Sequence, residues 1–220
     1  MKHLLTLIAI FTCGTCFANT ISCKTSIALL HRDTSSPVIV FFEDFVDNKN
    51  GWTVTDNKYL QASMEGGLYY LKALRHAFGE AHQIIIDQKK DFEIETRIKI
   101  LSGNADHKNY YSMLFWGREG LDSYYFTFSK DGYVSVELCD GQNQSDCKIM
   151  KGSLIKVELI ADDFNVYTIR KTGDMYSFMV NGTKLYEMPF VPFFGNSIGF
   201  GAGRKVSLAI DYLRITSPGQ

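Results

Sequence analysis

Apolar and polar residues alternate with a period of two through the middle of the chain. Three segments show the alternation: residues 92–100, 124–128 and 134–138. Successive side chains of a β-strand point to opposite faces of a sheet, so each segment is predicted to bury one face and expose the other. Polar turns separate the segments. We therefore expect an antiparallel meander with one solvated surface.

The remaining chain also favours strands. Short apolar segments occur at 38–45, 84–86, 154–160, 164–171, 175–180, 198–203 and 206–215. The dipeptide Asn181-Gly182 separates two of them and favours a tight hairpin, because a type I′ turn needs positive φ at both central residues. No segment sustains the 3.6-residue period of an amphipathic helix. The sequence predicts an all-β fold, a two-sheet antiparallel β-sandwich.

The first residues have the character of a targeting segment. Lys2 and His3 precede an apolar run, residues 4–11, that is too short to span a bilayer as a helix. The sequence Cys16-Phe17-Ala18 offers a small-x-small cleavage site. We predict a signal peptide at 1–18 and a secreted or periplasmic protein without a transmembrane segment. A bacterial lipoprotein anchored at Cys16 is the alternative.

The mature chain is predicted to contain one domain. Residues 19–37 lack a clear period and are interpreted as an N-terminal arm or linker that is dispensable for folding. Residues 38–216 have a length typical of one β-sandwich domain. Residues 217–220 are interpreted as a tail.

Two cysteines flank a polar loop. Cys139 ends a predicted strand, and Cys147 begins the next apolar segment. In an oxidising compartment a disulfide between them would close a hairpin, and two free surface thiols are the alternative. Cys23 is left without an assigned role.

The near-neutral net charge gives no reason to expect a nucleic-acid or membrane partner. Charged residues make up 21% of the chain and the net charge is −1. No field of one sign directs the protein to nucleic acid or to an anionic membrane. Aromatic residues make up 14%, including twelve tyrosines, which suits a sandwich with a partly apolar outer face.

Three segments carry a resemblance to known proteins: the opening at 42–52, the centre at 91–98 and the close at 198–215. The opening reads Asp-Phe … Asn-Gly-Trp, and the close reads Ile-Gly-Phe … Ile-Asp-Tyr-Leu-Arg-Ile. Together they resemble the concanavalin A-like lectin/glucanase superfamily, including bacterial laminin-G-like and 3-keto-disaccharide hydrolase-like domains. The resemblance implies a jelly roll whose first and last strands lie side by side. That fold hosts lectins, glycosidases and structural modules, so it does not fix a function.

Glu93 and Glu95 are the best candidates for catalytic carboxylates. On one strand they would face the same way, about 6–7 Å apart, and glycosidases place two carboxylates on that scale. Laminarinase-type members of the superfamily carry a Glu-x-Asp-x-x-Glu motif on such a strand. Here the third carboxylate position falls on Ile98, or on Arg97 in the shorter form of the motif. We interpret the row as solvated charges, and an extracellular glycoside hydrolase is the alternative.

A ligand-binding face is the preferred hypothesis. If even positions of 92–100 and 124–138 face the core, the odd positions, among them Thr127 and Glu137, form an exposed sheet surface. If Tyr111, Met113 and Phe115 are buried, Ser112 and Trp116 join that surface; a core position for Trp116 is the alternative. The candidate ligand-binding residues are Arg97, Ser112, Trp116, Arg118, Tyr125 and Tyr133.

Aromatic rings beside hydrogen-bonding groups suit the recognition of sugar rings. The sequence therefore predicts a secreted, noncatalytic module that binds carbohydrate or cell-envelope glycan. A module that binds a protein partner through the same face is an alternative. No cofactor is predicted. Asp44 and Asp211 offer hard oxygen ligands for a structural calcium ion; the preferred interpretation is that Asp211 caps or pairs at a sheet edge.

Overall fold

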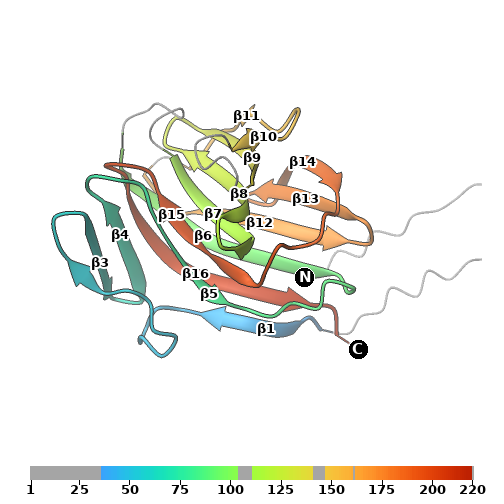
Figure 1. Ribbon diagram of the computed structural model, residues 1–220, viewed down its shortest axis with the longest axis horizontal. Helices are drawn as coiled ribbons and strands as arrows, with labels where there is room; N and C mark the ends of the chain where they lie inside the picture. Colours follow the sequence, from blue (N-terminus) through green and yellow to red (C-terminus); the bar gives the residue numbers. More distant parts are fainter. Residues whose placement is uncertain (1–35, 104–110, 141–146, 161, 220) are drawn as a thin grey trace, which may run out of the picture. The chain divides into compact units, whose positions relative to one another are not determined.

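The computed structural model describes residues 36–103, 111–140, 147–160 and 162–219 (Figure 1). The predicted signal peptide, the alternative anchor at Cys16, and Cys23 lie outside the described residues. None of the described residues belongs to a helix that could cross a membrane.

The described residues fold into two antiparallel sheets. Sheet A has the order β14 (Thr183–Pro189), β13 (Met175–Val180), β12 (Asn165–Thr172), β6 (Phe92–Ser102), β16 (Ser207–Ser217), β4 (Leu68–Ala73), β3 (Leu60–Glu65) and β2 (Thr55–Asp56), with β1 (Val38–Glu43) also paired to β16. Sheet B has the order β10 (Lys148–Ile149), β9 (Tyr133–Cys139), β8 (Asp122–Ser129), β7 (Tyr111–Glu119), β15 (Ser197–Ala202) and β5 (Phe78–Gln83), with β11 (Ile155–Lys156) paired to β9.

The first and last strands lie side by side, as the resemblance implied. β1 pairs with β16 in antiparallel register, from Val38 opposite Ser217 to Glu43 opposite Leu213 (Figure 1). The all-β sandwich is thus confirmed.

The predicted single meander is wrong in one respect. β6 lies in the middle of sheet A, whereas β7, β8 and β9 form consecutive hairpins in sheet B. The chain changes sheets between β6 and β7. Alternation predicts which side chains of a strand share a face, but it carries no information on which sheet that strand joins.

The core lies between the sheets and is rich in aromatic side chains. Ile94 and Ile98 of β6 point into it and are fully buried, as their period-two spacing predicted. Phe126 of sheet B meets Tyr167 and Phe178 of sheet A, with ring centroids 6.0 and 5.5 Å away in edge-to-face geometry. These contacts join the two layers.

The predicted disulfide is present. Cys139, at the end of β9, is bonded to Cys147, just before β10. β10 pairs with β9 through Lys148 opposite Leu138, so the bond closes the hairpin beside its first ladder pair. The loop between the two cysteines, residues 141–146, lies outside the described part.

Candidate functional site

The six predicted ligand-binding residues occupy three different environments. Arg97 lies on the outward face of sheet A, Ser112 and Trp116 are fully buried, and Arg118, Tyr125 and Tyr133 lie on the outward face of sheet B. The prediction that all six share one open face is therefore wrong.

Trp116 belongs to the core because both parities of β7 are apolar and the parity that carries Trp116 faces the aromatic side chains of sheet A. Its indole ring lies 5.7 Å from Phe178 and 6.1 Å from Tyr176, both on β13. Ser112 and Leu114 share this inward parity and are fully buried. The outward parity of β7 is instead that of Tyr111, Met113 and Phe115.

The outward face of sheet A carries a row of mutually satisfied charges. Arg97 pairs with Asp211 at 2.7 Å, and Arg170 pairs with Glu93 at 2.6 Å. Glu95 accepts hydrogen bonds from both Arg214 and the Tyr212 hydroxyl. Glu93 and Glu95 are thus each held in an ion pair with an arginine of a neighbouring strand.

Neither predicted calcium ligand stands near a metal-binding cluster. Asp211 is engaged by Arg97, and Asp44 accepts a hydrogen bond from the backbone N–H of Val46. The described residues contain no group of three or more His, Cys, Asp or Glu side chains arranged to hold a metal ion.

The outward face of sheet B is built of cross-strand rows. One row runs from Phe115 on β7 through Tyr125 on β8 to Glu137 on β9. The next row runs from Met113 through Thr127 to Ser135. Phe115, Met113, Thr127 and Ser135 are buried. The partly exposed side chains form what we call the tyrosine face: Tyr111, Arg118, Tyr125, Tyr133 and Glu137.

A hydrogen-bond network fixes the carboxylate of this face. The Ser135 hydroxyl donates to Glu137 Oε1 at 2.7 Å, and Thr127 Oγ1 lies 3.2 Å from the same oxygen. Thr127 Oγ1 and Ser135 Oγ are 2.5 Å apart. These two hydroxyl groups thereby orient Glu137 Oε1. No described residue forms a hydrogen bond with the other carboxylate oxygen, Oε2.

Two phenols of the face, those of Tyr111 and Tyr125, have raised pKa values. Burial raises the pKa of Tyr111, and the negative charge of Glu137 raises it further. Burial also raises the pKa of Tyr125, where Arg118 lowers it and Glu137 raises it. At neutral pH both hydroxyl groups can therefore donate hydrogen bonds to a ligand.

Solved structures share this architecture at low sequence identity. The laminarinase from Rhodothermus marinus superposes with a TM-score of 0.58 at 13% identity, covering 85% of this chain and 100% of that one. The carbohydrate-binding module CBM66 from Bacillus subtilis gives 0.54 at 12% identity, covering 73% and 92%. The β-glucanase of Bacillus licheniformis gives 0.55 at 12%, covering 85% and 100%.

The chain shares the two-sheet jelly-roll fold of these structures. No protein-family model matches its sequence, and no curated protein matches it. Identities this low establish the fold alone, so the function has to be argued from the site.

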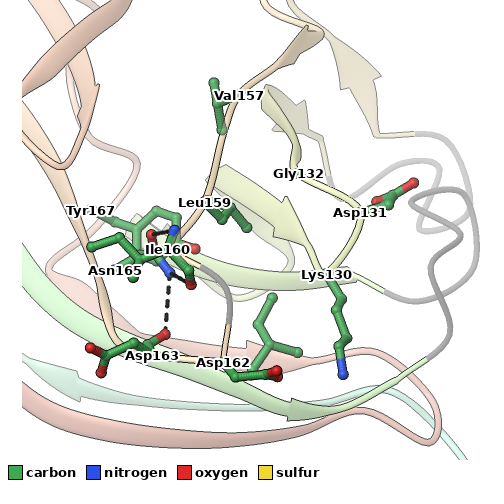
Figure 2. Close-up of a pocket in the computed structure, with 11 residues that line it drawn as sticks. Lys130, Asp131, Gly132, Val157, Leu159, Ile160, Asp162, Asp163, Asn165 and Tyr167 are labelled. Atoms are coloured by element: carbon green, nitrogen blue, oxygen red, sulfur yellow. Dashed lines mark hydrogen bonds between the residues drawn. The ribbon is translucent and has the colours of Figure 1, made fainter.

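One end of the jelly roll contains a cavity of about 260 Å³ (Figure 2). Its walls are the β8–β9 turn, with Lys130, and the segment between β11 and β12, with Leu159 and Asp162. The amide of Asn165 hydrogen-bonds to Ile160 and to backbone Asp163, as the dashed lines in Figure 2 show. That amide is occupied in holding the loop and is not free to bind a ligand.

Two members of the tyrosine face differ from the predicted set. Alternation in 134–138 placed Glu137 on the exposed surface. Its hydrogen-bond network with residues of both strands follows only from the β8–β9 register. Burial of Tyr111 together with Met113 and Phe115 was the condition for placing Ser112 and Trp116 on the open face. Tyr111 is partly exposed because it lies at the first position of β7, at the rim of the face.

Proposed function

We propose that the chain is a noncatalytic module that binds carbohydrate through the tyrosine face of sheet B. The observation that carries the proposal is the pairing of Tyr125 with Glu137 in one cross-strand row. A partly exposed ring lies beside a carboxylate that is already oriented by Ser135 and Thr127.

This arrangement suits the two chemical surfaces of a sugar. The C–H face of a pyranose ring packs on an aromatic ring, and a contact of this kind is worth about 1 kcal/mol. The hydroxyl groups at the ring edge donate to a carboxylate, and hydrogen bonds to charged groups contribute about 1.5–3 kcal/mol. Tyr111 and Tyr133 lie farther along the same face, and the Lys156 ammonium lies 5.5 Å from the centroid of the Tyr133 ring.

The number of carboxylates favours binding over hydrolysis. Away from the β7–β8 turn, Glu137 is the one carboxylate among the described outward-facing side chains of β5, β7, β8, β9 and β15. Glycoside hydrolysis uses a pair of carboxylates flanking the scissile bond. The similar solved structures include both glucanases and a carbohydrate-binding module, and this count is what supports binding in the proposal.

The compartment fits the proposal. The Cys139–Cys147 disulfide is typical of an oxidising environment. Together with the predicted signal peptide, it supports a secreted or periplasmic protein that meets extracellular or cell-envelope glycans.

A glycan array probed with the full chain tests the proposal, followed by titration calorimetry on the best glycan. Tyr125→Ala should weaken binding about tenfold, and Glu137→Gln should weaken it by a comparable or larger factor. Tyr70→Ala is the matched control, because Tyr70 is a half-buried tyrosine on sheet A and should bind normally. Absence of binding to every glycan would overturn the proposal.

Incubation of the bound glycan with the protein separates binding from hydrolysis. We expect no new reducing ends after prolonged incubation. Product release that Glu137→Gln abolishes would replace the binding module with an enzyme.

A further inference from the structure

Arg118 sits at the edge of the tyrosine face in a fixed position. Its Nε donates to the carbonyl oxygen of Gly120 at 3.0 Å, and its guanidinium carbon lies 5.3 Å from the centroid of the Phe115 ring. Phe115 is itself held in place: a Cβ atom on Gly79 would lie only 3.2 Å from its ring. The base and one face of the guanidinium are therefore occupied, which restricts its rotation before any ligand arrives.

The remaining donors of Arg118 have no carboxylate partner among the described residues. The three arginines in the strands of sheet A differ, because Arg97, Arg170 and Arg214 are each paired with an aspartate or glutamate. A guanidinium presents its Nη groups as a planar fork that matches the two oxygens of a carboxylate or sulfate. Arg118 is thus a preorganised anion-binding group with no anion of its own.

The neighbours of Arg118 place its guanidinium at one end of the tyrosine face, with the Glu137 carboxylate at the other end. Arg118 faces Ser197 across the β7–β15 ladder, and Gln83 donates to the Ser197 hydroxyl at 2.7 Å. Tyr125 lies on β8, between Glu137 on β9 and Phe115 on β7. The opposing effects of Arg118 and Glu137 on the pKa of Tyr125 agree with this order, since both charges act on the same hydroxyl.

We infer that the tyrosine face selects glycans that carry an anionic group, with Arg118 binding the anion. This inference rests on the proposed carbohydrate-binding function and names the class of ligand. The sugar ring lies on Tyr125, neutral hydroxyl groups point toward Glu137, and the sugar carboxylate or sulfate ester points toward Arg118. The carboxylate of Glu137 repels an anion placed in the reverse orientation, so a single orientation is favoured.

Binding to three polysaccharides tests the inference: polygalacturonate as a polyuronate, dextran sulfate as a sulfated glycan, and laminarin as a neutral glucan. Affinity electrophoresis and titration calorimetry at pH 7 supply the dissociation constants. We expect one of the two anionic polymers to bind at least tenfold more tightly than laminarin, and the identity of that polymer distinguishes carboxylate from sulfate.

Three variants locate the effect. Arg118→Gln should weaken binding of the preferred anionic polymer at least tenfold and should weaken binding of laminarin, which carries no anion, by a much smaller factor. Arg118→Lys keeps the charge but lacks the planar fork, so it should restore only part of the affinity; it also provides the test if Arg118→Gln melts early. Arg170→Gln, an exposed arginine on sheet A, is the matched control and should bind like the parent.

The outcomes distinguish selectivity for anionic glycans from carbohydrate binding itself. Laminarin binding equal to that of both anionic polymers, with no effect of Arg118→Gln, would overturn the inference and leave carbohydrate binding intact. Anionic binding that Arg118→Gln does not weaken would also overturn it. Failure to bind any of the three polymers, together with a negative glycan array, would reject the proposed function itself.

Discussion

Trp116 and Tyr124 face each other across β7 and β8, and their rings stack with centroids 5.5 Å apart inside the core. The same indole also contacts Phe178 on the opposite sheet. Trp116 therefore joins the two layers of the sandwich, and a residue in this position contributes to stability.

Trp116→Ala should lower the free energy of unfolding by about 3–5 kcal/mol, because it removes a large buried side chain and leaves a cavity. Trp116→Phe should cost less, since it keeps an aromatic ring among Tyr124, Tyr176 and Phe178. Urea denaturation of the two variants gives the comparison. Normal stability of Trp116→Ala with impaired glycan binding would contradict the core position.

Glu43 is a fully buried carboxylate whose oxygens accept hydrogen bonds from three donors. Its two oxygens accept hydrogen bonds from the backbone N–H of Phe45, the side-chain amide of Asn50 and the indole N–H of Trp52, at 2.8, 2.6 and 2.9 Å. The carboxylate thereby holds the loop that follows β1 against the core.

Glu43→Gln should destabilise the fold by about 1–3 kcal/mol, because one acceptor oxygen is replaced by an amide that donates toward another donor. Chemical denaturation measures the loss. Glu65→Gln, an exposed position on β3, is the control and should change stability little. Equal stability of both variants would show that the three hydrogen bonds contribute nothing net.

The Cys139–Cys147 disulfide joins two residues that are eight positions apart in the sequence. Replacement of both cysteines by alanine should lower stability by about 2–3 kcal/mol, because the unfolded chain regains loop entropy. A reducing agent should lower the melting temperature of the parent and leave that of the double variant unchanged. Unreduced peptide mapping should show this cross-link; a cross-link to Cys23 would contradict it.

His82 makes stability depend on pH. Its ring packs 4.1 Å from that of Trp52, and its buried Nε2 has no hydrogen-bond partner among the residues that the structure describes. Burial lowers the pKa of His82 below its ordinary value, and the nearby carboxylates of Glu80 and Glu43 oppose this shift only in part. The unfolded chain therefore takes up a proton at a higher pH than the folded chain does.

Stability should accordingly fall as the pH drops below about 6.5, the ordinary histidine value, and this loss should continue to the lowered pKa of the folded state. Thermal melts between pH 7.5 and 5 measure it. His82→Gln should flatten the curve in that window, whereas His76→Gln, at an exposed position, should not. A parent curve that rises on acidification would contradict the sign.

The sequence by itself determined much of the local structure. Alternation in 92–100 correctly buried Ile94 and Ile98 and placed Glu93 and Glu95 on the opposite, outward face, because the two faces of a strand are set by the pleat and need no tertiary information. The spacing of Cys139 and Cys147 around a polar loop predicted their disulfide, because a hairpin brings two such residues together. Both features depend on residues close together in the chain.

Only the tertiary structure decided which faces these residues share. β6 and β7 are neighbours in sequence but belong to different sheets, so Arg97 and Tyr125 point away from each other on opposite sides of the sandwich. The apolar residues of β7 fit either face by composition alone. Trp116 turned inward because the aromatic rings of β13, about sixty residues later in the chain, provide its packing partners, and such long-range packing leaves no local period in the sequence.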